Sequence, residues 1–172
     1  LSFNLVDGFY IEHLPYYIGL GLLTGLVSLY FTRTTLFIEG LFQKIKLKFV
    51  KVIIGGISLG LLIFMLPSLY GEGYEFLELL IDNKVDGVVN EDLFHLSSTS
   101  THLIIFLGLI LIFKVVAMAV TNGSGGVGGI FAPSLFMGGV FGVFYARFIN
   151  LLPSVNIPVK NMALVGMAGV MA

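Results

Sequence analysis

Residues 122–135 read Asn-Gly-Ser-Gly-Gly-Val-Gly-Gly-Ile-Phe-Ala-Pro-Ser-Leu, and the interpretation of the whole chain starts from them. Five of the seven residues at 123–129 are glycine, which lets the backbone turn sharply and lets a ligand approach main-chain atoms. Residues 130–152 predict a helix with Pro133 in its first turn, where the missing N–H costs nothing. The unpaired N–H groups of a helix start carry partial positive charge, so this stretch predicts an anion site.

The composition is that of a membrane protein. Of the 172 residues, 57% are hydrophobic and 11% are charged, whereas a soluble domain carries about a quarter charged residues. The net charge of −1 argues against nucleic acid as a partner. The chain has no cysteine, which excludes a disulfide framework and a thiolate metal site. We therefore predict an all-α, multi-pass membrane protein.

Apolar runs predict five spans, at residues 15–41, 52–66, 103–121, 130–152 and 160–172, and a short helix at 75–81. Irregular backbone at membrane depth is tolerated only when it is buried in protein or lines a watery cavity. Broken helices whose amino ends face the interior hold anionic cargo in many transporters. The chain starts without Met and stops inside a predicted helix, so we expect a piece of a longer protein.

The residues at 129–133, Gly-Ile-Phe-Ala-Pro, match the Gly-x-Phe-x-Pro signature of the CLC chloride channels and chloride/proton antiporters, a family that the chain resembles. The neighbouring residues 123–125 and 134–135 extend the similarity, and residues 67–74 resemble the family's Pro-x-x-x-Gly-x-Gly-Tyr turn. The resemblance implies that residues 1–172 are a partial CLC transmembrane domain, an inverted-repeat bundle with broken helices taken mostly from its second half. The gating glutamate, the serine loop and the inner tyrosine would belong to the remainder of the CLC chain.

The resemblance also implies chloride transport, with chloride as the substrate and with no cofactor, by a homodimer in the lipid bilayer. By the match, the backbone N–H groups of Ile130 and Phe131 would contact the central chloride, and those of Gly129 and Ala132 would line the neighbouring outer site. Partial charges suit this cargo, because they bind a monovalent ion and still release it. The Phe131 side chain would narrow the path.

Lys114 lies inside the third predicted span, fifteen residues before Gly129, where CLC sequences often carry a basic residue near the inner mouth of the pore. A charge inside a span suggests a function, and the expected role is to raise the local anion concentration. The alternative is a lysine whose ammonium reaches the lipid headgroups.

Several alternatives stay open at this point. Gly21 and Gly25 predict close helix packing, either within the chain or at a dimer interface. The lysines between the first two spans lie in the cytoplasm by the positive-inside rule but outside by the family's topology, so the orientation is open; they are Lys44, Lys46, Lys48 and Lys51. Channel and antiporter are not distinguished.

Other functional classes find little support. Residues 82–87 depart from a calcium loop at the third and twelfth ligand positions, Lys84 and Leu93, and we expect no metal site. No phosphate-binding Gly-Lys-Ser/Thr motif, catalytic triad or cofactor motif stands out, so we expect no enzyme. The main alternative function is a structural helical bundle in which the glycine-rich turn is only a hinge.

Overall fold

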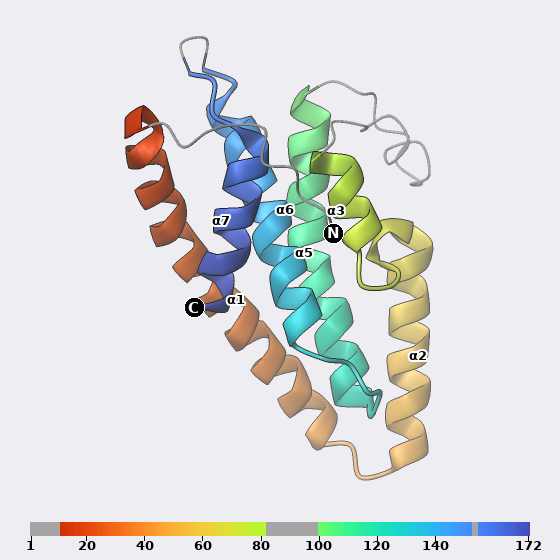
Figure 1. Ribbon diagram of the computed structural model, residues 1–172. Coiled ribbons are helices and arrows are strands. Elements are labelled where there is room, and N and C mark those ends of the chain that lie inside the picture. Colours follow the sequence, from red (N-terminus) through yellow and green to blue (C-terminus); the bar gives the residue numbers. More distant parts are fainter. Residues whose placement is uncertain (1–10, 82–99, 153–154) are drawn as a thin grey trace.

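The computed structural model describes residues 11–81, 100–152 and 155–172, so the segment at 82–87 lies outside the described residues. In chain order the elements are η1 (Ile11–His13), α1 (Leu14–Gln43), α2 (Lys48–Met65), η2 (Pro67–Leu69), α3 (Tyr74–Ile81), α5 (Ser100–Ser124), α6 (Phe131–Ile149) and α7 (Val159–Met171). Every element within these ranges is helical, which confirms the predicted all-α class (Figure 1).

Four helical segments of the described residues are long and apolar enough to cross a membrane. They are Ile11–Gln43, Lys48–Met65, His102–Ser124 and Phe131–Ile149. The fifth expected span, at residues 160–172, corresponds to the shorter apolar helix α7, which has 13 residues and reaches Met171, next to the last residue of the sequence. A helix of that length rises about 20 Å, whereas the hydrocarbon core of a bilayer is about 30 Å thick.

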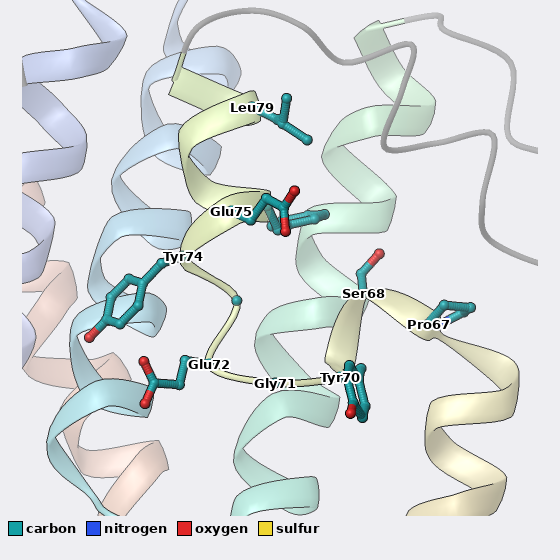
Figure 2. A pocket seen from close by; sticks show the side chains of 10 residues that line it. Pro67, Ser68, Tyr70, Gly71, Glu72, Tyr74, Glu75 and Leu79 are labelled. Atoms are coloured by element: carbon teal, nitrogen blue, oxygen red, sulfur yellow. The ribbon is translucent and has the colours of Figure 1, made fainter. Parts of the chain in front are cut away.

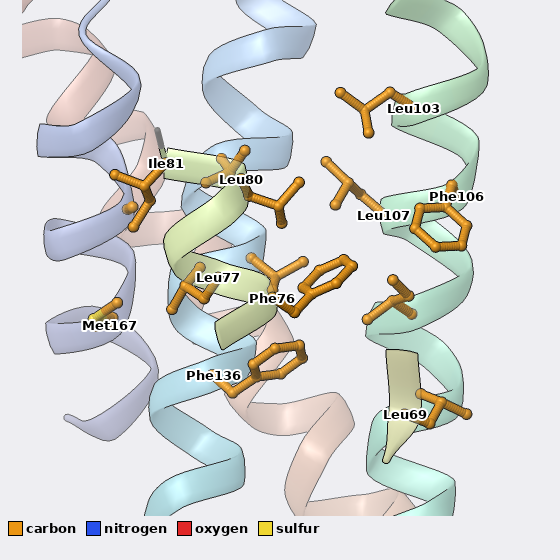
Figure 3. Packing of buried hydrophobic residues seen from close by; sticks show 14 of the residues in the cluster. Leu69, Phe76, Leu77, Leu80, Ile81, Leu103, Phe106, Leu107, Phe136 and Met167 are labelled. Carbon is orange, nitrogen blue, oxygen red and sulfur yellow. The ribbon is translucent and has the colours of Figure 1, made fainter. Parts of the chain in front are cut away.

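The helices form one bundle in which α5 and α6 lie between α1 and α2 (Figure 1). The helix α6 packs along α7, α1 crosses α5 and α7, and α2 packs on α5. Side chains from α3, α5, α6 and α7 fill the largest core cluster (Figure 3). Its fully buried members are Leu77, Leu80, Phe106, Leu107, Ile110, Phe136, Val140, Val143 and Ala163. This core holds the start of α6 against the middle of α5.

The helix α5 continues to Ser124, three residues beyond its predicted end at 121. It closes with a Schellman arrangement, in which the Gly126 N–H donates to the Thr121 carbonyl at 2.9 Å and the Gly125 N–H donates to the Asn122 carbonyl at 3.1 Å. Gly125 has φ +101°, a left-handed conformation that favours glycine. The glycine-rich turn is therefore shorter than the sequence suggested and comprises residues 125–130.

Glycine also sets two close helix contacts. At Gly142 of α6, a Cβ atom would fall on the carbonyl oxygen of Met162 in α7, and Gly138 and Gly166 approach each other in the same way. Small residues of this kind let the backbones of α6 and α7 approach each other closely. By contrast, Gly21 and Gly25 of α1 have no described atom within 4 Å of an added Cβ, so packing within these residues does not explain them.

Candidate functional site

The candidate site begins at the amino end of α6. Ile130 is the N-cap residue, with φ −86° and ψ −29°, and no side chain caps this end of the helix. Ser134 does not supply a cap, because its hydroxyl donates to the Phe131 carbonyl at 2.8 Å. The helix therefore starts with its first N–H groups uncapped.

Three backbone N–H groups at this helix start have no backbone hydrogen-bond partner within the described residues. The first bond into α6 runs from the Ser134 N–H to the Ile130 carbonyl at 3.1 Å. The N–H groups of Ile130, Phe131 and Ala132 make no backbone hydrogen bond to any residue within the described ranges, and Pro133 has no N–H to offer. Unpaired donors at a helix start, with the dipole behind them, are suited to an anion.

A cavity of about 390 Å³ lies beside this helix start. Its wall includes Gly129, Ala132 and Pro133 from the α6 side, Lys114 and Thr121 from α5, and the turn after η2. A Cβ added to Gly129 would meet no described atom within 4 Å, so the space in front of this residue is open. The structure thus brings Gly129, Ala132 and Lys114 to one cavity.

Lys114 is buried, with 4% of its surface exposed. Its Nζ donates to the carbonyls of Leu69 at 3.0 Å and Gly71 at 2.8 Å, and lies 4.9 Å from the centre of the Phe136 ring. The side chain therefore points into the protein, and this geometry does not match the alternative of an ammonium that reaches lipid headgroups. Two carbonyls and an aromatic face stabilise a buried cation through partial negative charge.

The turn after η2 presents Glu72 to the same cavity. Gly71 and Gly73, with φ +66° and +85°, reverse the chain on both sides of Glu72. Gly73 has a second constraint, because a Cβ there would lie 2.6 Å from Cδ2 of Phe136. The cavity wall therefore carries one ammonium, from Lys114, and one carboxylate, from Glu72.

A second hollow, of about 550 Å³, is lined by the same turn and by the start of α3 (Figure 2). Its lining includes the carboxylates of Glu72 and Glu75 and the hydroxyl-bearing Ser68, Tyr70 and Tyr74, but no lysine or arginine. Although it is the larger of the two, this electrostatic character does not suit an anion. The smaller cavity, next to the uncapped amides, is the better candidate.

Ile130 and Phe131 lie at the edge of this cavity region with exposed side chains. Their exposed fractions are 56% and 64%. The described residues therefore supply one wall of a site. The Phe131 ring is exposed on the side of the site that these residues leave open. Neither residue lines the cavity, so the structure does not enclose the full set of four predicted residues.

The sequence analysis did not single out Glu72, which lines this cavity. It treated residues 67–74 as a structural turn, and Glu72 is 57 positions before Gly129, so no local spacing connects the two. The signal that could have found it is the pair of glycines around a single acid, which is typical of an exposed, sharply reversed turn.

Comparisons with known proteins place this site in context. A family model described as voltage gated chloride channel matches residues 1–172. The chain is 31% identical to the chloride channel protein CLC-e of Arabidopsis thaliana, over 92% of this chain and 23% of that protein. It is 35% identical to CLC-f of the same plant, over 92% of this chain and 20% of that protein. It is 32% identical to a putative ClcB-like chloride channel protein of Ralstonia nicotianae, over 91% of this chain and 33% of that protein. No solved structure matches the chain.

Proposed function

Because the chain belongs to the voltage-gated chloride channel family, we propose that it takes part in carrying chloride across the membrane, with the amino end of α6 as an anion-binding element. The chain spans between 20% and 33% of the length of these three relatives, whose names describe chloride channels. Its multi-pass character is shown by the family and by the four apolar helices.

The observation that carries the proposal is the set of uncapped amides at Ile130, Phe131 and Ala132. In this proposal, the Ile130 and Phe131 N–H groups donate to the central chloride, and Gly129 and Ala132 line the neighbouring position. Amide dipoles carry partial charge, so they hold a chloride ion without the tight grip of a full ammonium. The exposed Phe131 ring borders the path and limits the access of water.

Lys114 acts at longer range in this proposal. Its ammonium is held by two carbonyls in the cavity wall and is not free to travel with an ion. A fixed positive charge in a low-dielectric wall raises the local concentration of anions. Glu72 opposes this effect from the same wall, so the field in the cavity depends on the balance of the two groups. The proposed roles of Lys114 and Glu72 are in anion binding, a step that channels and antiporters have in common.

Replacing Ile130 by proline tests the role of its amide. Proline removes the N–H, its ring favours φ near −65°, close to the −86° of Ile130, and the preceding Gly129 has no Cβ to clash. Loss of one hydrogen bond to a charged ligand predicts a drop in chloride affinity of about ten- to a hundredfold. We would measure binding by calorimetry on the full chain in detergent, and chloride efflux from liposomes.

The matched control is Ile130→Ala, which removes the side chain and keeps the N–H. We expect this variant to bind chloride like the unaltered chain. Chloride-dependent protection of the Ile130 and Phe131 amides from hydrogen exchange gives a second readout. If the proline and alanine variants bound chloride equally well, with no such protection, the turn would be a connection only and the structural bundle would be the better reading.

A further inference from the structure

The connection between α1 and α2 carries an unusual concentration of positive charge. We call residues 44–51 the basic turn. It holds four lysines in eight residues, and no acidic residue occurs between Glu39 and Glu72. Lys44, Lys46 and Lys48 are exposed, and Lys51 is half-buried.

These ammonium groups have no partner within the described part of the chain. Only backbone hydrogen bonds involve the four lysines there, such as that from the Lys44 N–H to the Leu41 carbonyl. Charges that are used to stabilise a fold are paired with carboxylates or carbonyls, as Lys114 is. In the basic turn, by contrast, no group of the described residues neutralises the lysine ammonium groups, and three of the four lysines are exposed.

Apolar side chains alternate with the lysines and are also uncovered. Leu47 and Phe49 have exposed fractions of 68% and 85%, the latter among the highest of the described hydrophobic residues. A soluble anion would gain nothing from such side chains. A surface that combines a charged headgroup layer with hydrocarbon below it would bind both kinds of residue.

The position of the basic turn fits that surface. The flanking helices α1 and α2 are both candidate membrane spans, the first ending at Gln43 and the second beginning at Lys48. Figure 1 shows this connection at one end of the bundle. A short link between two spans must emerge at a face of the bilayer, where lysines reach phosphates and apolar side chains enter the boundary region.

We propose that the basic turn binds the headgroups of anionic phospholipids in the surrounding membrane. The lysine ammonium groups contact the lipid phosphates, and Leu47 and Phe49 insert beside the acyl chains. This inference does not depend on the anion site at α6, because it uses different residues and a different ligand.

Native mass spectrometry of the full chain in a neutral detergent tests the proposal. The probes are dioctanoyl phosphatidylglycerol, which is anionic, and dioctanoyl phosphatidylcholine, which is zwitterionic. Each lysine near an anionic surface contributes about a fivefold gain in affinity, so the triple variant K44Q/K46Q/K48Q should bind phosphatidylglycerol on the order of a hundredfold more weakly. Phosphatidylcholine should bind weakly to all variants.

Two controls keep the test specific. The charge-preserving variant K44R/K46R/K48R should retain phosphatidylglycerol binding. The single variant K46Q is compared with R33Q, which removes one exposed cation from the middle of α1, and only K46Q should weaken binding. These single changes also give the answer if the triple variant fails to fold.

Three outcomes would overturn the inference. Equal phosphatidylglycerol affinity for the unaltered chain and for K46Q would show that the basic turn is not involved. Equal binding of the two lipids would remove the role of charge. Displacement of the lipid by inorganic phosphate at the same concentration would identify a site for soluble anions instead of a membrane surface.

Discussion

At the scale of single residues, glycine has two different roles in the turn, one at Gly129 and the other at Gly126. Gly129 lines the cavity with open space at its Cβ position, so Gly129→Ala should leave stability unchanged and place a methyl group at the proposed anion position. We expect chloride affinity to fall about tenfold, as when one methyl group crowds a pocket. Calorimetry of chloride binding, with thermal unfolding of the same samples, checks both parts.

Gly126→Ala is the matched comparison. Gly126 does not line the cavity, and a Cβ there would lie 2.9 Å from the carbonyl oxygen of Thr121, so the backbone of the turn must move. The expected result is a loss of about 1–3 kcal/mol in the free energy of unfolding. If Gly129→Ala destabilised the chain as much as Gly126→Ala, the open space at Gly129 would have no functional meaning.

Removing the charge of Glu72 and removing that of Lys114 should change chloride affinity in opposite directions. Glu72→Gln removes a negative charge from the cavity wall and should raise chloride affinity by about two- to threefold at low salt. The gain should shrink as ionic strength rises, because Glu72 is exposed and its charge is screened. Lys114→Met should lower affinity, whereas Lys114→Arg keeps the charge. Chloride titrations at two ionic strengths test this, and a salt-independent effect of Glu72→Gln would contradict the electrostatic role.

At the scale of elements, the contact between α6 and α7 depends on glycine more than any other helix pair in the described residues. Gly142→Ala would place a methyl group on the Met162 carbonyl and should lower the free energy of unfolding by about 1–3 kcal/mol. Gly21→Ala on the open face of α1 should be neutral or stabilising by up to about 1 kcal/mol, since alanine favours the helix. Thermal unfolding in detergent distinguishes them, and equal shifts would show that the close approach is not needed.

The ends of elements also show where sequence reasoning stops. The sequence predicted that the third span ends at 121, directly before the glycine-rich stretch that starts at Asn122. The structure keeps Asn122 and Gly123 in α5, and the Phe42 ring packs on Gly123, where an added Cβ would lie 2.9 Å from Phe42 Cδ2. That contact joins residues 81 positions apart, and no local pattern contains it. The family resemblance could locate the start of α6 because that signature is contiguous.

At the scale of the whole molecule, the sequence predicted the class and the four long spans, since hydropathy is a sum over many residues and tolerates local errors. It predicted Lys114 as a candidate site residue but not the groups that hold it. Those groups, Leu69 and Gly71, come from a turn whose position depends on the packing of η2 and α3 on α5 and α6. Tertiary packing of this kind decides the chemistry of a buried charge, and single-sequence patterns do not report it.

The way in which Lys114 is held has a mechanical consequence. Its backbone belongs to α5, whereas the two oxygen atoms that hold its ammonium belong to the last residue of η2, Leu69, and to Gly71 in the turn that follows. If that turn slides along α5, the flexible side chain of Lys114 can bend, so that its ammonium stays bound to the two carbonyls and moves with the turn. The electrostatic potential in the cavity would then change because the Lys114 ammonium moves, and no group would have to gain or lose a proton.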